Sequence, residues 1–288
     1  MKKFKKVYLE ITNICNLNCS FCPKTTRMGK LMSIDSFTYI IEEIRPYTDH
    51  VYFHLMGEPC IHPDLEEFLT ICSKKQLKVN MTTNGTLLSE VKEILLEAPA
   101  LRKVSISLHS FEANDQTIDL QEYIDAIVAF VIEATQNKII CELRLWNMNG
   151  EKIQGSNVLN QEILKMIEVK LNLGFRLEDS LSHVHRKKLA DFLYIGMEEK
   201  FEWPEIAVPV VNDEVFCYGL RDQFGILVDG TVVPCCLDNE GNIPLGNIFD
   251  FSLNNILHSE RARNLYNGFS RRRAVEDLCK RCEYAKRY

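Results

Sequence analysis

Apolar and polar residues alternate along several short stretches of the chain, and each stretch precedes a segment whose apolar residues recur every three to four positions. Residues 7–12 form the first alternating stretch, and a helical pattern begins at Ser33 and ends at Pro46. Further strands are predicted at 51–56, 77–83, 103–109 and 139–146, and further helices from Pro63, over 89–98, over 120–136 and over 160–172. Repeated succession of strand and helix predicts a parallel α/β fold.

One face of each predicted strand is aliphatic, whereas the other face carries polar side chains. These polar residues are Glu10, Thr12, Tyr52, His54, Asn80, Thr82, Ser105, Ser107, His109, Glu142 and Arg144. A sheet buried between two helix layers is apolar on both faces, and a closed eight-stranded barrel fills its interior with branched aliphatic side chains. The pattern therefore predicts a sheet curved around a polar cavity.

The length of the chain limits how many strand–helix units this sheet contains. Residues 1–216 allow about six units of ~30–36 residues each, and the sixth strand is predicted at 192–197. We therefore expect a partial (β/α)6 barrel at 1–205, followed by a small C-terminal domain at 206–288. No apolar run approaches the ~20 residues that span a membrane, and the start of the chain does not resemble a signal peptide, so we expect a cytoplasmic protein. The net charge of -6 argues against nucleic acid as a partner.

Three cysteines lie close together just past the first predicted strand. Cys15, Cys19 and Cys22 are spaced Cys-x3-Cys-x2-Cys, whereas a zinc knuckle supplies its ligands as two close pairs. Three thiolates on one loop suit three corners of a 4Fe-4S cluster, which normally takes four cysteines. The next cysteine along the chain is Cys60. One iron of such a cluster would therefore be open to a substrate or cofactor.

This loop, with the aromatic Phe21 beside its last cysteine, resembles the signature of the radical-SAM superfamily. In that family S-adenosylmethionine chelates the open iron through its amino and carboxylate groups. The resemblance implies an enzyme that cleaves S-adenosylmethionine reductively to a 5′-deoxyadenosyl radical, which removes a hydrogen atom from substrate. A flavodoxin or ferredoxin-type protein is the implied electron donor.

A second motif, at the end of the second predicted strand, extends this resemblance. Met56-Gly57-Glu58-Pro59 is similar to the Gly-Gly-Glu-Pro motif of the family, with Met56 in place of the first glycine. The resemblance implies that Gly57, Glu58 and Pro59 hold the amino group of S-adenosylmethionine. The alternative is a simple turn before a helix, but the motif's place at a strand end, where barrel active sites lie, favours the cofactor.

Polar residues on later strands complete the expected cofactor site. By the same resemblance, Thr83, Asn84 and Ser107 approach the carboxylate and ribose of S-adenosylmethionine. Arg144 can pair with the carboxylate through two hydrogen bonds, or it can form a structural ion pair with Glu142 or Glu10.

The catalytic base is not assigned. The candidates are His54 and His109, which face the predicted cavity, and Arg144. A proton acceptor is useful if a substrate alcohol or amine is oxidised. A structural role is the alternative for each histidine.

The C-terminal part of the chain contains a second set of cysteines. Cys217, Cys235, Cys279 and Cys282 can ligate a second cluster completely, and Cys236 is an alternative to Cys235. Zinc is the other candidate metal for four cysteines. Asp229-Gly230 lies between two apolar runs and predicts a hairpin that ends near Cys235.

The spacing of these C-terminal residues resembles the SPASM/twitch extension of a radical-SAM subgroup. The matching features are Gly230-x4-Cys235, Leu245-Gly246-Asn247-Ile248 and the late Cys-x2-Cys pair. Four cysteines and a short tail are similar to the twitch form with one auxiliary 4Fe-4S cluster, as in the aminocyclitol dehydrogenase of butirosin biosynthesis.

A cluster with four protein ligands cannot bind substrate at iron, so electron transfer is its expected role. Hydrogen abstraction followed by loss of one further electron is a two-electron oxidation, and we expect dehydrogenation of a small polar metabolite. The alternatives are a peptide-modifying maturase and, from another class, a non-catalytic iron–sulfur electron carrier. Residues 258–288 contain five more basic than acidic residues, which indicates a solvated helix face or a docking patch for an acidic electron donor.

Overall fold

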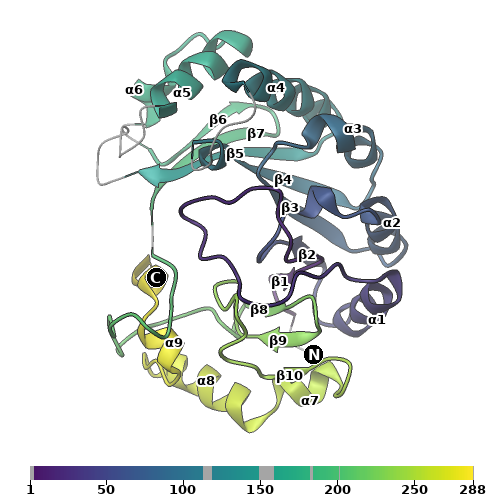
Figure 1. The fold of residues 1–288 in the computed structure, drawn as a ribbon, viewed down its shortest axis with the longest axis vertical. Coiled ribbons are helices and arrows are strands. Elements are labelled where there is room, and N and C mark those ends of the chain that lie inside the picture. Colours follow the sequence, from purple (N-terminus) through teal and green to yellow (C-terminus); the bar gives the residue numbers. More distant parts are fainter. Residues whose placement is uncertain (1–2, 113–118, 149–158, 182–183, 201, 288) are drawn as a thin grey trace. The chain divides into compact units, whose positions relative to one another are not determined.

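The computed structural model describes residues 3–112, 119–148, 159–181, 184–200 and 202–287, which form two compact units. Unit one contains the described parts of Met1–Asn16, Cys22–Val79 and Phe201–Tyr288, and unit two contains those of Leu17–Phe21 and Asn80–Lys200. Figure 1 shows the chain coloured from its N-terminus to its C-terminus. In the described part of the chain, no helix is long and apolar enough to cross a bilayer.

The strands of unit one come from both ends of the chain. They are β1 (Lys6–Leu9), β2 (His50–Phe53), β8 (Gln223–Ile226), β9 (Thr231–Val233) and β10 (Gly246–Asn247), in the spatial order β10-β9-β8-β1-β2. Strand β1 pairs in parallel with both β2 and β8, and β8 pairs in antiparallel with β9. The C-terminal hairpin therefore extends the sheet that begins at β1, whereas the predicted domain boundary near residue 205 stays a prediction.

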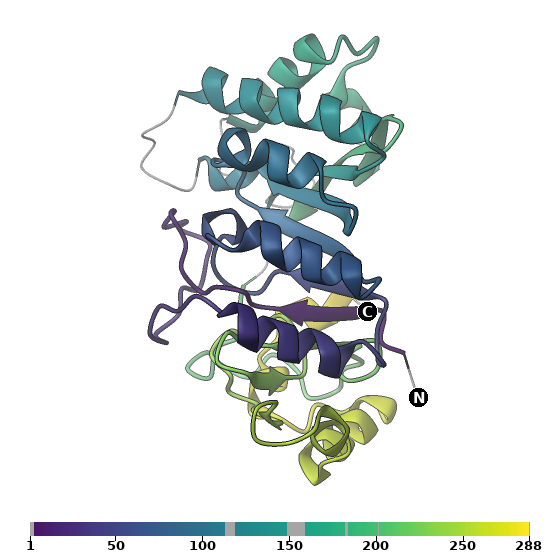
Figure 2. The same ribbon diagram turned by 90° about the vertical axis from the view of Figure 1, so that its right-hand side faces the viewer.

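Helices α1 (Ile34–Ile44) and α2 (Leu65–Lys74) pack against each other beside β1 and β2 in unit one (Figure 2). The Ser33 hydroxyl caps α1 by accepting a hydrogen bond from the Ser36 amide at 3.2 Å, as its position predicted. The Phe37 ring stacks on Phe68 at 4.0 Å and meets the edge of Phe53 at 5.8 Å. The aliphatic strand face therefore packs on the helices as expected.

Two element boundaries in unit one differ from the sequence prediction. Strand β2 ends at Phe53 rather than at residue 56, and α2 begins at Leu65 rather than at Pro63. The intervening residues form a turn with a left-handed Gly57 and the short 3-10 helix η1 (Pro59–Ile61), so their backbone hydrogen bonds are not those of a strand or an α-helix.

The hairpin predicted at Asp229-Gly230 is confirmed. The Gly230 amide donates to the Leu227 carbonyl at 2.9 Å, and Gly230 has a φ of +89°, which a residue with a Cβ rarely adopts. The remaining elements of unit one are α7 (Leu253–Leu257), α8 (Glu260–Ser270), α9 (Asp277–Lys280) and the 3-10 helix η3 (Glu283–Arg287).

Unit two contains a second group of neighbouring strands. They are β3 (Lys78–Thr83, of which unit two contains the part from Asn80 on), β4 (Leu101–Ser107), β5 (Ile140–Met148), β7 (Leu193–Glu199) and β6 (Arg186–Ala190). Their order is β3-β4-β5-β7-β6. Strand β5 pairs in parallel with β4 and β7, so β7 confirms the predicted sixth strand. The antiparallel strand β6 was not predicted, because its residues are exposed or half-buried and three of them are basic, which gives no apolar alternation.

The helices of unit two are α3 (Leu88–Leu96), α4 (Leu120–Gln136), α5 (Leu159–Lys170) and α6 (Leu177–Leu181). The bounds of α4 are those predicted, and the Asp119 carboxylate caps it by accepting from the Gln121 amide at 2.7 Å. Strand β4 ends at Ser107, and Leu108–Ser110 form the 3-10 helix η2. The prediction that His109 lies on a strand is therefore wrong, because the backbone turns after Ser107. The α/β fold class is confirmed.

Candidate cofactor and metal sites

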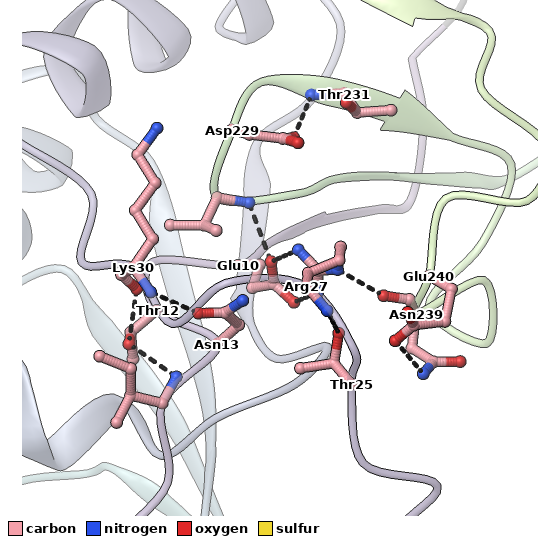
Figure 3. A network of polar contacts seen from close by, with 12 residues as sticks. Glu10, Thr12, Asn13, Thr25, Arg27, Lys30, Asp229, Thr231, Asn239 and Glu240 are labelled. Atoms are coloured by element: carbon pink, nitrogen blue, oxygen red, sulfur yellow. Dashed lines mark hydrogen bonds and ion pairs between the residues drawn. The ribbon is translucent and has the colours of Figure 1, made fainter.

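The loop that contains Cys15, Cys19 and Cys22 follows β1 and is closed at its base by polar side chains (Figure 3). The Thr12 hydroxyl donates to the Lys30 carbonyl at 3.0 Å, and Asn13 donates to the Met28 carbonyl at 3.0 Å. The Lys30 amide donates back to Asn13 Oδ1 at 2.7 Å. Residues before the first cysteine are therefore joined to residues after the last one. Cys15 is exposed, Cys22 is half-buried and Cys19 is buried.

Gly57 lies directly against the backbone that precedes Cys15. It has a φ of +77°, and a Cβ at this position would lie 2.4 Å from the Thr12 carbonyl oxygen and 2.8 Å from that of Ile14. The next amide, of Glu58, donates to the Ile14 carbonyl at 2.9 Å. Met56 is not in the left-handed region, so the residue that departs from the family motif causes no backbone strain.

The Glu58 side chain is held in place by the turn that follows it. It is 2% exposed, and its Oε1 accepts a hydrogen bond from the Cys60 amide at 3.0 Å. This bond caps η1, whose first residue is Pro59, a favoured residue at that position. The structure thus fixes the orientation of the carboxylate, and its binding to an amino group stays a prediction.

Glu10 does not line an open cavity, which corrects its predicted place on a polar cavity face. Its side chain is fully buried and pairs with Arg27 through both carboxylate oxygens, at 2.8 Å from Nη1 and 2.6 Å from Nη2 (Figure 3). The Val228 amide also donates to Glu10 Oε2 at 2.9 Å. Sequence reasoning missed Arg27, because its partner lies 17 residues away and no local pattern identifies the pair.

The cysteines of the C-terminal part are half-buried and lie in the same part of unit one. Burial raises the pKa of the Cys235 thiol well above its ordinary value, and the thiols around it raise it further; these are Cys236, Cys217, Cys279 and Cys282. Burial, followed by Cys217 and Cys282, likewise raises the pKa of Cys279. Four cysteines from three distant segments therefore lie close enough to influence one another electrostatically, and their binding of one cluster stays a prediction.

Backbone amides point at two of these sulfurs. The Gly219 amide donates to Cys217 Sγ at 3.4 Å, and the amides of Tyr284 and Ala285 hydrogen-bond the Cys282 sulfur. Hydrogen bonds to a ligand sulfur stabilise its thiolate and tune the potential of a bound cluster. The donor set thus fits an iron–sulfur cluster. Among the described side chains, no three His, Cys, Asp or Glu residues form a group that could hold a single metal ion.

Cys236 has different surroundings from Cys235. Its sulfur accepts a hydrogen bond from the buried Tyr8 hydroxyl, and burial raises its pKa to about 11 despite that bond. It packs against a small apolar cluster that includes Tyr8, Leu55 and Val233. The structure thus gives Cys236 a contact with β1, and the choice between Cys235 and Cys236 as the cluster ligand stays a prediction.

His109 lies in unit two against Phe21, with the two ring centroids 4.7 Å apart. Its Nδ1 is 3.1 Å from the Arg144 carbonyl oxygen, and burial lowers its pKa to about 4. A neutral imidazole with so low a pKa is a weak base at neutral pH. His54 belongs to unit one, where its ring lies 5.9 Å from Tyr8.

Arg144 is buried on β5 and oriented by two neighbours. Its Nη2 donates to the Ser107 hydroxyl at 2.9 Å, and its guanidinium lies 4.5 Å from the centre of the Trp146 ring. Glu142, one of its predicted alternative partners, forms ion pairs with Lys103 and with Arg186. The structure therefore brings Ser107 and Arg144 together, as the two were expected to act at one site.

Thr83 and Asn84 shape the turn at the end of β3. The Gly85 amide donates to the Thr83 hydroxyl at 3.0 Å, and the Thr86 amide donates to Asn84 Oδ1 at 2.9 Å. The Tyr123 hydroxyl from α4 donates to the Asn84 carbonyl at 2.7 Å. These bonds hold the strand end in one conformation, and contact with a cofactor stays a prediction.

Comparison with known families identifies both metal-binding regions. Residues 9–155 match the radical SAM superfamily model. The chain belongs to the radical SAM superfamily. A 4Fe-4S cluster and S-adenosylmethionine are therefore cofactors of this enzyme. Residues 217–283 match SPASM, an iron–sulfur cluster-binding domain, which supports an auxiliary cluster rather than zinc at the C-terminal cysteines.

Two relatives and one solved structure match most of this radical-SAM chain. A probable GTP 3′,8-cyclase of Methanococcus maripaludis is 23% identical, covering 85% of this chain and 89% of the relative. The GTP 3′,8-cyclase of Aquifex aeolicus is 25% identical, covering 97% and 90%. Among solved structures, BtrN in complex with AdoMet and 2-DOIA has a TM-score of 0.62 at 17% identity, covering 98% of this chain and 94% of BtrN.

A further solved structure shares the fold. Streptococcus suis SuiB bound to its precursor peptide SuiA has a TM-score of 0.62 at 15% identity, covering 99% of this chain and 71% of SuiB. These similarities confirm the fold expected for a radical-SAM enzyme with a C-terminal iron–sulfur extension.

Proposed function

We propose that this radical-SAM enzyme is an oxidoreductase that dehydrogenates a small polar metabolite. When bound, the first cluster and S-adenosylmethionine supply a 5′-deoxyadenosyl radical that takes a hydrogen atom from substrate. Loss of one more electron and one proton then completes a two-electron oxidation. A flavodoxin or ferredoxin-type protein provides the first electron.

The gathering of the C-terminal cysteines is the observation that carries this proposal. Cys217, Cys235, Cys279 and Cys282 are half-buried in the same part of unit one, where their thiols influence one another electrostatically. Four protein ligands fill the coordination of a cluster, so such a cluster transfers electrons and does not bind substrate at iron. Dehydrogenation requires such an electron acceptor. A small polar substrate is supported by BtrN, which shares the fold and whose structure contains 2-DOIA.

We assign the cysteines and Glu58 as follows. Cys15, Cys19 and Cys22 ligate the first cluster, and Glu58 accepts a hydrogen bond from the amino group of S-adenosylmethionine. The carboxylate is suited to this role, because η1 holds it in place through the Cys60 amide. Cys235 rather than Cys236 ligates the auxiliary cluster, because the Cys236 sulfur accepts a hydrogen bond from the Tyr8 hydroxyl.

The residues of unit two receive separate assignments. Arg144 binds a carboxylate with the help of Ser107, since a guanidinium fixed by a hydroxyl and an indole ring is preorganised for bidentate binding. Thr83 and Asn84 support the β3 turn beside the cofactor. His109 excludes water from the surroundings of Arg144 rather than removing a proton, because its pKa is about 4.

The two clusters have different proposed roles, so removing the ligands of each cluster in turn tests the proposal. Anaerobically reconstituted enzyme is incubated with S-adenosylmethionine, dithionite and a panel of amino-alcohols that includes aminocyclitols. We expect the Cys279→Ala, Cys282→Ala variant to form 5′-deoxyadenosine but no oxidised product. The Cys15→Ala, Cys19→Ala, Cys22→Ala variant should form neither, and each variant should lose about half of the iron.

Cluster removal also destabilises the fold, because metal binding and folding are coupled. Circular dichroism must therefore show that the tail variant retains its helices. If this folded variant still forms oxidised product at the normal rate, the tail cluster is structural and the dehydrogenase proposal fails. If the intact enzyme forms no 5′-deoxyadenosine at all, an electron carrier is favoured instead.

A second candidate is radical cyclisation of a purine nucleotide, favoured by relatives named GTP 3′,8-cyclase that match along nearly the whole chain. Incubation with GTP distinguishes the two candidates, because a cyclisation product has the mass of the substrate, whereas a dehydrogenated product is two hydrogens lighter. Parallel incubation with short peptides tests the maturase alternative, for which SuiB bound to SuiA is the structural precedent.

A further inference from the structure

Three adjacent basic residues between α8 and α9 stand apart from most of the other basic residues near the end of the chain, which form ion pairs. Arg261 pairs with Glu276, and both Lys280 and Arg281 approach Asp277. Arg271, Arg272 and Arg273 follow α8 and are exposed. In the described part of the chain, no carboxylate forms an ion pair with these three arginines. We refer to them as the arginine turn; it joins α8 and α9 (Figure 1).

The backbone of the arginine turn is rigidly defined. The Arg273 amide donates to the Gly268 carbonyl at 2.8 Å and the Arg272 amide to the Phe269 carbonyl at 3.1 Å. Arg272 has a φ of +57°, so the helix ends in a Schellman motif with arginine in the position that glycine usually occupies. A Cβ at Gly268 would lie 2.8 Å from the Arg273 carbonyl oxygen, so the turn folds back closely over α8.

This turn adjoins a ligand of the auxiliary cluster. The Phe269 ring, two residues before Arg271, would lie 3.4 Å from a Cβ at Gly219. The Gly219 amide in turn donates to Cys217 Sγ. Ser270 accepts a hydrogen bond from Arg221 at 2.6 Å, which fastens the end of α8 to the same segment. The arginine turn is thus one layer of packed residues away from a sulfur that we assign to the cluster.

We propose that the arginine turn is the docking surface of an acidic protein that carries single electrons and removes the electron from the auxiliary cluster. This inference rests on the proposed dehydrogenation. There, the substrate radical left by hydrogen abstraction loses one proton to solvent and one electron to the tail. That electron must leave before the next turnover, and the oxidised carrier, an iron–sulfur or flavin protein, gains it.

Charge decides the kind of partner. The chain has a net charge of -6, so its general surface repels acidic proteins and nucleic acid alike, and only a local positive patch attracts them. Three arginines on one fixed turn suit the carboxylates that rim an acidic carrier, and such pairs chiefly accelerate association. Contact with a cluster-bearing segment is useful to an electron carrier and irrelevant to a nucleic acid.

The test compares two variants with the same change in net charge. The arginine-turn variant carries Arg271→Gln, Arg272→Gln and Arg273→Gln. The control carries Lys78→Gln, Lys138→Gln and Lys165→Gln, three exposed lysines for which no ion pair is found in the described part of the chain. Binding of a purified flavodoxin of net negative charge to the anaerobic, cluster-loaded enzyme is measured at 20, 150 and 500 mM salt.

We expect the arginine-turn variant to bind flavodoxin about tenfold more weakly at 20 mM salt, since three exposed ion pairs are lost. The control should change by less than about twofold, and the difference should vanish at 500 mM salt, where charges are screened. Equal weakening of both variants would show an effect of net charge alone. No weakening of either, or binding of a DNA duplex or anionic vesicles in place of flavodoxin, would also overturn the proposal.

Two kinetic measurements separate this inference from the proposed function. In a single turnover driven by dithionite, the arginine-turn variant should still form oxidised product, because the electron stays on the tail. When oxidised flavodoxin is added after the dithionite has been removed, the appearance of flavin semiquinone should be about tenfold slower than in the control variant. If 5′-deoxyadenosine formation driven by reduced flavodoxin falls instead, the turn docks the electron donor. If the turn binds flavodoxin as expected but no substrate is oxidised, the dehydrogenase proposal alone fails.

Discussion

Arg27 and Glu10 form a buried ion pair that joins the first cysteine loop to the C-terminal hairpin within unit one. Both guanidinium end nitrogens bond the carboxylate, and Arg27 Nε donates to the Asn239 carbonyl at 2.9 Å. Glu240, the next residue, accepts from the Thr26 hydroxyl at 2.6 Å. The segment after Cys22 and the loop after Cys236 are therefore held by one network, shown in Figure 3.

Removal of Arg27 should strongly destabilise unit one. In Arg27→Met the Glu10 carboxylate stays buried without its counter-charge, which costs about 3–5 kcal/mol of unfolding free energy. The Glu10→Gln, Arg27→Met double variant should recover much of this loss, because no charge remains buried. Urea unfolding of the anaerobic protein measures both values. A matched surface change, Lys75→Met, which breaks an exposed pair with Glu42, should cost less than about 1 kcal/mol. Equal losses for Arg27→Met and Lys75→Met would contradict this account.

Gly57→Ala should disturb the first cysteine loop. The new Cβ would lie 2.4 Å from the Thr12 carbonyl oxygen at a φ of +77°, so we expect a loss of about 2 kcal/mol or more in unfolding free energy. Iron bound by the Cys15 loop should fall with it. Gly174→Ala is the control, because nothing lies within 4 Å of a Cβ there. Iron content and stability equal to those of the control would show that the turn tolerates a side chain.

Glu58 variants should separate binding from folding. Glu58→Ala removes both the proposed acceptor for the amino group and the cap of η1, so S-adenosylmethionine affinity should fall about ten- to a hundredfold and stability by about 1 kcal/mol. Glu58→Gln retains an acceptor for the Cys60 amide, so it should lose affinity but little stability. Anaerobic titration calorimetry and urea unfolding measure the two effects. Unchanged affinity in both variants would remove Glu58 from the cofactor site.

The low pKa of His109 predicts a pH dependence of stability. Burial lowers the folded-state pKa to about 4, so below about pH 6.5 the unfolded state binds a proton that the folded state does not. Stability is therefore lost as the pH falls toward 4. Between pH 7.5 and 5.5 the His109→Asn variant should lose about 1 kcal/mol less unfolding free energy than the wild type. Parallel curves for the two proteins would mean that His109 is charged when folded.

Much of the fold could be predicted from the sequence, because its signals are local. The bounds of α4, the Ser33 cap of α1 and the Asp229-Gly230 hairpin depend on residues within a few positions of each other. The Cys-x3-Cys-x2-Cys loop is equally local, so its spacing alone indicated a cluster with an open iron. The ends of β2 and β4 were predicted too late, because alternation continued past the point where turn hydrogen bonds replace the ladder.

The tertiary structure alone decided which distant groups become partners. Alternation placed Glu10 on a polar strand face, but only folding brings Arg27 and the Val228 amide to it. The sequence supplied the set of tail cysteines, whereas only the folded chain brings Cys235 near Cys217, Cys279 and Cys282. Periodicity records which side of an element faces the core. A buried charge or thiol is stabilised only by the specific groups that surround it, and that choice is made when the whole chain packs.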